Sequence, residues 1–368
     1  MKILHVLPTL HSAYGGPVRV ARTMQAGLER LGHEVDIFPS AREPGLVEHR
    51  GRFLYWPGFD GMRELMGKIS KADIVHIHGL WTLPTTMAGR FAYAQGRPYV
   101  ITPHGMLDKW SMKRSRLKKG LYAALLERRN IELCAGLHFL NDEEAAEAHS
   151  FIGEQKTFVI PNGIDMAVFS KAPSAIDLQT IYPDIRASTV VLFLGRIHEK
   201  KGLDILIPAL KKTLDQGVDV HLLIAGPDEG GYQGQIERLV DQYGVRHAVT
   251  FTGEVHDEKK HVLLKNCDFF VLPSYQEGDS VAVKEALAAG LPVLITYACH
   301  LHEVQDSMAG IVCDTDIDQV AAGITKLAGN ESLRMAMSSN AKKLIVEKYR
   351  SDVLLSELEC VYRDILEK

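Results

Sequence analysis

The chain has 368 residues, which exceeds one typical domain and predicts two, each able to bury its own core. With 46% hydrophobic and 24% charged residues, its composition is that of a soluble globular enzyme. A net charge of -4 provides no basic field that would indicate a nucleic-acid partner. Five scattered cysteines without a C-x-x-C pair fit a reducing compartment and argue against a disulfide framework or a zinc site. Because no apolar run is long enough for a signal peptide or a membrane span, we expect a cytoplasmic protein.

The N-terminal half begins with a strand, a helix and a second strand. Ile3 to Leu7 reads as a buried strand, Pro17 suits the start of a helix, and Glu34 to Phe38 is the next strand. No G-x-G-x-x-G occurs here, which argues against a dinucleotide cofactor. Gly15 and Gly16 offer backbone N–H groups at the end of a strand. The alternative is a turn that simply needs glycine.

Histidines occupy the ends of two further strands. His76 and His78 lie on one face of the strand from Asp73 to Gly79, a spacing that suggests a metal. No third ligand sits at a convincing spacing, so we predict no metal and assign His76 to the core. His78, near the end of the strand, is a candidate site residue. His104 follows the next strand in a Pro/Gly-flanked loop, where it either meets substrate or hydrogen-bonds its own loop.

The segment from Lys109 to Arg129 interleaves lysines and arginines with apolar residues. Such a basic amphipathic stretch is typical of helices that lie on an anionic membrane surface. It could equally bind a phosphorylated acceptor. The third interpretation is a solvated helix that packs on its own domain.

A second series of alternating strands and helices follows a stretch of weak periodicity between Ala167 and Ser188, where we place the domain boundary. The alternation predicts a parallel doubly wound sheet in each of two α/β domains, which face one another across a cleft. The expected strands of the second half are Thr189–Leu194, His221–Ala225, Val249–Thr252 and Cys267–Leu272, and the expected helices are Glu199–Asp215, Gln233–Gln242 and Asp257–Leu264.

Charged residues gather at the carboxyl ends of two strands of the second half. Arg196 and Lys201 follow its first strand, where cations can neutralise a diphosphate. Glu277 lies in the loop after Leu272, and Glu285 lies about two turns into the helix that follows. Carboxylates accept from hydroxyls and helix N-termini favour anions, so a sugar nucleotide fits this arrangement. The alternatives are a helix cap at Glu277, a solvated Glu285 and two surface cations.

These residues form a pattern that resembles glycosyltransferase family 4, the retaining enzymes of the GT-B fold. The resemblance rests on Gly195-Arg196 with Lys201-Gly202, on Pro161 to Asp165, on Glu277 and Glu285 within Glu-Gly-x(6)-Glu-Ala, and on Gly15-Gly16. It covers nearly the whole chain. It implies a domain of residues 1–165 completed by a C-terminal helix of about residues 350–368, and a donor domain of residues 166–349.

The resemblance also implies a role for each matching residue. Glu277, His104, Arg196 and Lys201 would be catalytic. Gly15, Gly16, His78 and His104 would lie on the acceptor side. The donor, a nucleoside-diphosphate sugar used without a cofactor or metal, would be bound by Arg196, Lys201, Val255, Glu277, Gly278, Asp279, Ser280, Val281 and Glu285.

Asp279 and Lys284 depart from the family pattern, which usually has a small or aromatic residue and an apolar residue there. The departures touch the sugar pocket and leave the donor sugar open. The function implied is hexose transfer to a glycan or lipid-linked acceptor in polysaccharide or cell-envelope biosynthesis, with peripheral attachment to the inner membrane face as one option. A nucleotide-sugar epimerase or hydrolase and a non-catalytic sugar-nucleotide-binding protein are the alternatives.

Overall fold

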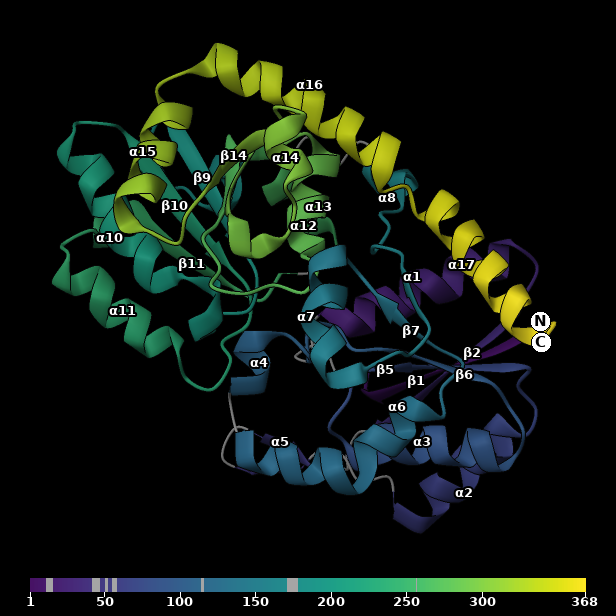
Figure 1. Ribbon diagram of the computed structural model, residues 1–368. Helices are drawn as coiled ribbons and strands as arrows, with labels where there is room; N and C mark the ends of the chain where they lie inside the picture. Colours follow the sequence, from purple (N-terminus) through teal and green to yellow (C-terminus); the bar gives the residue numbers. More distant parts are fainter. Residues whose placement is uncertain are drawn as a thin grey trace. The chain divides into compact units, whose positions relative to one another are not determined.

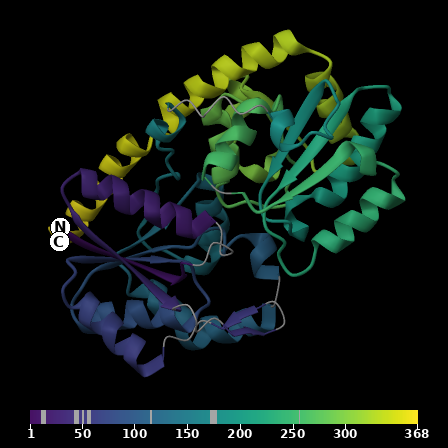
Figure 2. The same ribbon diagram turned by 180° about the vertical axis from the view of Figure 1, so that it is seen from behind.

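A computed structural model of the chain describes residues 1–10, 16–41, 47–49, 52–54, 58–113, 116–170, 178–255 and 257–368. The chain divides into two compact domains. The N-terminal domain contains Met1–Gly163 and Ser351–Lys368, and the C-terminal domain contains Ile164–Arg350. Figure 1 and Figure 2 show the alternation of strands and helices in both domains.

The N-terminal domain is built on a six-stranded parallel sheet with the order β2-β1-β5-β6-β7-β8. Its central strands are buried on both faces, as continuous apolar runs in parallel sheets usually are. The strands are β1 Lys2–Thr9, β2 Glu34–Ala41, β5 Ile74–His78, β6 Tyr99–Thr102, β7 Gly136–Phe139 and β8 Thr157–Val159, and β3 Val47–His49 pairs with β4 Arg52–Leu54 in a separate hairpin.

Helices surround this sheet, and the last helix of the chain, α17, packs beside α1 in both views. Gly27 of α1 permits this contact, because a Cβ there would lie 2.1 Å from the Cδ1 atom of Leu355. The two chain ends lie close together (Figure 1). The helices are α1 Gly16–Arg30, α2 Gly58–Ile69, α3 Leu83–Ala94, α4 Lys109–Lys113, α5 Arg116–Tyr122, the π-helical turn η2 Ala123–Glu127, α6 Arg128–Glu132, α7 Asp142–Ile152 and α17 Ser351–Leu366.

The basic segment contributes α4, α5, η2 and α6, and it has an inner and an outer face. On the inner face, the buried carboxylate of Glu127 accepts hydrogen bonds from Thr86 at 2.8 Å and from Asn130 at 3.1 Å. On the outer face, Leu117, Leu121 and Leu125 are 90%, 64% and 67% exposed. The segment therefore packs on its own domain and still presents an apolar stripe to solvent.

The C-terminal domain holds a second six-stranded parallel sheet, with the order β11-β10-β9-β12-β13-β14. The strands are β9 Thr189–Leu194, β10 Val220–Ala225, β11 Val249–Gly253, β12 Phe269–Leu272, β13 Val293–Thr296 and β14 Gly310–Cys313. The helices are α8 Met166–Ser170, α9 Leu178–Ile181, η3 Glu199–Lys201, α10 Leu203–Asp215, α11 Gln233–Gln242, η4 Arg246–Ala248, α12 Asp257–Asn266, α13 Val281–Ala289, η5 Tyr297–Cys299, α14 Glu303–Asp306, α15 Ile317–Ala328 and α16 Glu331–Lys348.

The predicted strands and helices of the C-terminal domain are present with small changes at their ends. The largest difference is the helix predicted from Glu199, which is a 3-10 turn over Glu199–Lys201 followed by α10. The break occurs at Gly202, whose left-handed φ of 72° interrupts the helical path. This break sets the direction of the lysines that precede it.

Candidate functional site

The sheet of the C-terminal domain reverses its strand order between β9 and β12. These two strands pair with each other, although β10 and β11 separate them along the chain. Open α/β sheets bind ligands at the carboxyl ends of the strands at such a reversal. Arg196 and Lys201 follow β9, and Glu277 follows β12, so the predicted cations and acid lie at this place.

The segments after β9 and β12 touch through their backbones. A Cβ on Gly202 would lie 1.9 Å from the carbonyl oxygen of Pro273, so only glycine permits this approach. The N–H of Tyr275 donates to the carbonyl of Lys200 at 2.8 Å. The two segments therefore form one unit, which places the lysines beside Glu277.

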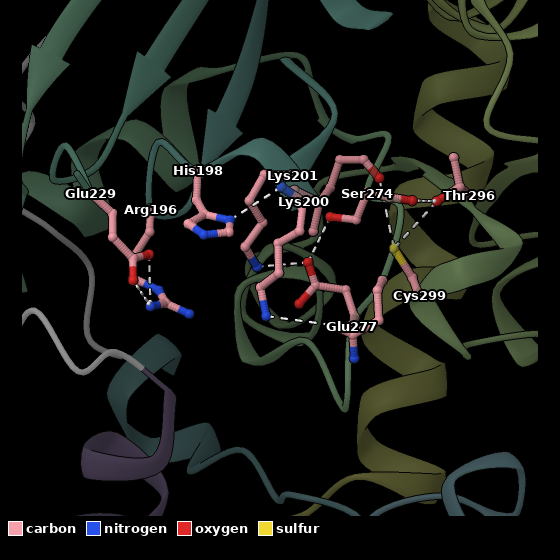
Figure 3. A network of polar contacts seen from close by, with 11 residues as sticks. Arg196, His198, Lys200, Lys201, Glu229, Ser274, Glu277, Thr296 and Cys299 are labelled. Carbon is pink, nitrogen blue, oxygen red and sulfur yellow. Dashed lines mark hydrogen bonds and ion pairs between the residues drawn. The ribbon is translucent and has the colours of Figure 1, made fainter. Parts of the chain in front are cut away.

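Glu277 accepts two hydrogen bonds on one carboxylate oxygen (Figure 3). The Lys201 amino group donates to Oε1 at 2.6 Å, and the Ser274 hydroxyl donates to the same atom at 2.6 Å. Burial acts to raise the pKa of Glu277, but the charges of Lys201 and Lys200 and these hydrogen bonds outweigh it and lower the pKa. Glu277 is thus held as a carboxylate in a fixed orientation.

Lys200 points toward the same carboxylate and was not among the predicted site residues (Figure 3). Its amino group lies 3.4 Å from Oε1 of Gln276. Burial and the like charge of Lys201 lower the pKa of Lys200 to about 8, although Glu277 opposes this shift. The lysine doublet was the signal in the sequence that could have identified Lys200, because the tight 3-10 turn brings both lysines beside Glu277.

The other two predicted charged residues are also paired. Nη1 of Arg196 donates to Oε1 of Glu229 at 2.9 Å and lies 2.8 Å from Oε2 in an ion pair, and both side chains are partly exposed. Glu285 of α13 accepts from the Lys260 amino group at 2.8 Å in a buried pair. Sequence reasoning missed Glu229 and Lys260, because each comes from an element distant in the chain.

The predicted donor-binding stretch from Gly278 to Val281 leads into α13. Ser280 is the N-cap residue and Val281 is the first residue of the helix, so the N-terminus of α13 follows closely on Glu277 in the chain. The N–H of Glu277 donates to the carbonyl of Ala298 at 3.0 Å, which anchors the loop. Val255 follows β11 and is buried.

Asp279 and Lys284 form a buried ion pair with each other. The amino group of Lys284 is fully buried and lies 2.5 Å from Oδ1 of Asp279. It also lies 4.1 Å from the ring centroid of Tyr349, a cation–π distance. Burial lowers the pKa of Lys284, and the charge of Asp279 opposes the shift. The sequence identified both residues as unusual but did not predict that they are partners.

The predicted acceptor-side residues lie in the N-terminal domain. Gly16 begins α1, and Gly15 lies outside the described residues. His104 follows β6 with a left-handed φ of 54°, and its Nε2 lies 2.9 Å from Nδ1 of His78. His78 is fully buried, and its hydrogen bond with His104 connects it to the more exposed ring.

A third histidine, which the sequence reasoning did not find, lies beside the His-x-His pair. His5 of β1 is in register with His76 of β5, and the ring nitrogens of His5, His76 and His78 lie within 4.8 Å of one another. No third ligand was expected from the spacing of residues in the sequence, and the neighbouring strand β1 supplies one. His76 nevertheless uses both nitrogens, toward Tyr362 and toward Thr102 at 2.6 Å. A metal would have to break these hydrogen bonds, so the residues do not fit a metal centre.

Two family models match the chain one after the other. The model described as Glycosyltransferase Family 4 matches residues 14–168, and the model described as Glycosyl transferases group 1 matches residues 184–344. The chain belongs to glycosyltransferase family 4. The resemblance seen in the sequence is confirmed, and the protein is a glycosyltransferase.

Relatives of this glycosyltransferase cover most of its length. An uncharacterized glycosyltransferase of Methanocaldococcus jannaschii is 28% identical over 96% of this chain and 95% of its own. The GDP-mannose:cellobiosyl-diphosphopolyprenol alpha-mannosyltransferase of Xanthomonas campestris is 24% identical over 88% of this chain and 86% of its own.

Solved structures show the same fold. HepE of Anabaena, in complex with UDP and glucose, has a TM-score of 0.77 at 18% identity over 99% of this chain and 100% of its own. Sucrose-phosphate synthase from Thermosynechococcus elongatus has a TM-score of 0.76 at 18% identity over 100% of both chains. The glycosyltransferase therefore has the predicted GT-B fold of two Rossmann-like domains.

The buried pair of Asp279 and Lys284 in this glycosyltransferase can be tested by a double-mutant cycle. We expect Lys284→Met to lower the free energy of unfolding by about 3–5 kcal/mol, because it leaves Asp279 buried without its cation. Asp279→Asn should likewise destabilise. The double variant should be more stable than the sum of the two losses predicts, as measured by urea unfolding. Additive losses would show that the two side chains do not depend on each other.

Proposed function

We propose that the protein is a retaining, metal-independent glycosyltransferase that moves a hexose-type sugar from a nucleoside-diphosphate sugar to a glycan or lipid-linked acceptor. The observation that carries this proposal is the pairing of Lys201 with Glu277 at the reversal of the C-terminal sheet. The solved HepE structures contain UDP or UDP-glucose, and the Xanthomonas relative is named for a GDP-mannose donor and a polyprenol-linked acceptor. The pathway we propose is polysaccharide or cell-envelope biosynthesis.

The cations of the site would stabilise the leaving nucleoside diphosphate. Negative charge develops on the diphosphate as the glycosidic bond breaks, and preorganised cations and helix N–H groups stabilise such charge in the transition state. Arg196, Lys200 and Lys201 supply three positive side chains after β9, and α13 supplies its N-terminus. We propose that these groups neutralise the leaving group without a metal.

Glu277 would position the transferred sugar. Its Oε1 is held by Lys201 and Ser274, which leaves Oε2 for a sugar hydroxyl. For retention we propose transfer on one face of the sugar, with the departing phosphate deprotonating the acceptor. A covalent intermediate on Glu277 is the alternative, and mass spectrometry after trapping with a slow donor analogue distinguishes the two.

The remaining donor contacts follow from their places in the C-terminal domain. We assign Glu285 to the ribose hydroxyls, Val255 to the base through its backbone, and the N–H groups from Gly278 to Val281 to the sugar and phosphate. Because the carboxylate of Asp279 is paired with Lys284, we assign the donor contact of Asp279 to its backbone N–H. On the acceptor side we keep Gly15, Gly16 and His104, together with His78, which hydrogen-bonds to His104.

Ligand binding and turnover test the proposed donor class. We expect at least one of UDP, GDP and ADP, or their hexose conjugates, to raise the melting temperature, because a ligand at about 100 times its Kd adds about 2.7 kcal/mol of stability.

With the donor found in this way, Arg196→Met should lower kcat/KM. The decrease should correspond to a loss of about 2–4 kcal/mol of transition-state stabilisation. Arg246→Met, which removes an exposed cation paired with Asp241, is the matched control.

Two outcomes of this experiment contradict the proposal. If no nucleotide or nucleotide sugar changes the melting temperature, the donor class is wrong. If the nucleotide sugar is consumed at the same rate with and without acceptor, the protein is an epimerase or hydrolase.

The affinity for nucleoside diphosphate should depend on the charge of Lys200. Its lowered pKa of about 8 means that it is protonated below this pH and loses its charge above it. The diphosphate is fully ionised above pH about 7, so affinity should fall as pH rises through about 8 and above. Lys200→Met should remove this dependence, and Lys343→Met, at an exposed lysine, should keep it. Calorimetry in two buffers should show proton uptake on binding near pH 8, and its absence would contradict the assignment of Lys200.

We also propose that the segment from Lys109 to Arg129 attaches the protein to an anionic membrane surface. Leu117, Leu121 and Leu125 are exposed at a four-residue spacing, which places them along one side of the helical segment. Lysines and arginines surround them in the sequence. An apolar stripe flanked by cations is the pattern of helices that lie in the membrane interface. Among the described residues, no helix is long and apolar enough to cross a membrane.

Vesicle flotation tests the membrane attachment. We expect binding to vesicles that contain phosphatidylglycerol and little binding to pure phosphatidylcholine. Replacement of Leu117, Leu121 and Leu125 by serine should abolish binding, because each leucine loses about 1.5–3 kcal/mol of apolar burial. Met335→Ser, at a residue of α16 that is 68% exposed, is the control. Binding that survives charge reversal at Lys113, Arg114, Lys118 and Lys119 would rule out the electrostatic part of the proposal.

A further inference from the structure

Five histidines from three strands and one loop form two hydrogen-bonded branches in the N-terminal domain. His5, His76, His78 and His138 are fully buried, and His104 is half-buried. Burial lowers the pKa of His5 and His104 to about 3 and of His138 to about 4, so these rings are neutral at pH 7. A neutral imidazole carries one proton, and its hydrogen bonds determine which nitrogen carries it.

The first branch has only one possible direction. Nε2 of His138 lies 2.7 Å from the carbonyl oxygen of Ile160, which can only accept, so this nitrogen carries the proton. Nδ1 of His138 must then accept from the hydroxyl of Thr102 at 3.0 Å. The Thr102 oxygen in turn accepts from Nε2 of His76 at 2.6 Å. Nδ1 of His76 is left to accept from the hydroxyl of Tyr362.

The second branch has no such anchor at its inner end. Nδ1 of His5 lies 2.8 Å from Nε2 of His78, and Nδ1 of His78 lies 2.9 Å from Nε2 of His104. Among the described residues, Nε2 of His5 has no hydrogen-bond partner. If the branch ran inward, with His104 donating to His78 and His78 to His5, the N–H at Nε2 of His5 would be buried without an acceptor, and such orphaned donors are rare. In the outward direction, from His5 to His104, Nε2 of His5 is only an acceptor without a donor.

The outward direction determines the proton on His104. His5 donates to His78, and His78 donates to Nε2 of His104, so the proton of His104 must sit on Nδ1. The loop that carries His104 is fixed by its backbone: His104 is held in a left-handed conformation, which non-glycine residues adopt at a cost. The carboxylate of Glu144, which is buried, accepts from the N–H of Gly105 at 2.5 Å and from the N–H of Leu140 at 3.0 Å.

We propose that His5 and His78 are positioning residues that hold His104 as a neutral imidazole with its proton on Nδ1. His104 is thereby a hydrogen-bond donor toward whatever it contacts through Nδ1, and the ligand group it recognises is an oxygen acceptor, such as a hydroxyl, carboxylate or phosphate oxygen. A metal at His5, His76 and His78 is the competing use of the cluster. The recognition step rests on the proposed function, whereas the proton arrangement does not.

Nitrogen NMR of the histidine rings in the full-length protein tests the arrangement directly. We expect His5, His78 and His104 to carry the proton on Nδ1, and His76 and His138 to carry it on Nε2. A spectrum in which His104 carries its proton on Nε2, or is charged at pH 7, would overturn the proposal. A shift of the His5, His76 and His78 signals on addition of stoichiometric Zn²⁺ would also overturn it in favour of a metal site.

His5→Asp is the informative variant, because an ionised carboxylate can only accept. It should reverse the second branch, so that His78 and His104 carry their protons on Nε2. His138 serves as the internal control in the same spectrum, because the Ile160 carbonyl fixes its proton independently. His5→Asn, which can still donate from the place of Nδ1, should restore the original pattern. If the aspartate variant does not fold, His5→Leu removes the hydrogen bond to His78 without adding a buried charge.

Activity then tests the role of His104 toward the ligand. With the nucleotide sugar that gives the largest thermal shift, His5→Asp should lower kcat/KM about tenfold or more, because Nδ1 of His104 would then present a lone pair to the ligand in place of a proton. His5→Asn should recover most of this loss. An unchanged kcat/KM with reversed protons would overturn the recognition role and leave the proposed function standing. Absence of turnover by the unaltered protein would contradict the proposed function, while the NMR result would still decide the proton arrangement.

Discussion

The ion pair between Lys201 and Glu277 is the interaction on which the C-terminal site depends. A largely buried ion pair is stable only if further hydrogen bonds offset the loss of hydration. Here the Ser274 hydroxyl supplies a hydrogen bond and Lys200 adds a second positive charge, and the glycine at position 202 permits the close approach of the two segments. Because β9 and β12 are neighbours only through the reversed strand order, the pair exists only once the sheet has formed.

The other charges of the site are arranged around this pair, and their exposure separates two functions. Lys260–Glu285 and Lys284–Asp279 are buried, so they fix α13 and the loop before it. Arg196–Glu229 is the most exposed of these pairs, at 26% and 39% of the side chains. A ligand phosphate can compete for an exposed cation at a small cost in desolvation. Of the cations in these pairs, Arg196 is therefore the one that could most easily exchange its carboxylate partner for a ligand phosphate. The buried pairs hold the geometry of the site.

The order of strands and helices could be predicted from the sequence, because apolar runs and glycine or proline stops are local signals. Glu277 and Arg196 could also be predicted, since each follows a recognisable strand. The contacts of Lys260 with Glu285 and of His5 with His78 could not, because each pair comes from elements that meet only in the folded domain. The Asp279–Lys284 pair could likewise not be predicted. The sequence shows that both residues depart from the family pattern, but the ion pair that explains them forms only inside the folded protein.

The two domains use the reversal of strand order in opposite electrostatic ways. At the reversal between β9 and β12, the buried carboxylate of Glu277 forms an ion pair with Lys201. At the corresponding reversal between β1 and β5, the rings of His5 and His76 hydrogen-bond to no carboxylate in the part of the chain that the structure describes, and burial lowers the pKa of both. A buried group without a counter-charge becomes neutral, and its specificity then lies in hydrogen-bond direction. The C-terminal domain is thus suited to stabilising charge, and the N-terminal domain to distinguishing hydrogen-bond donors from acceptors.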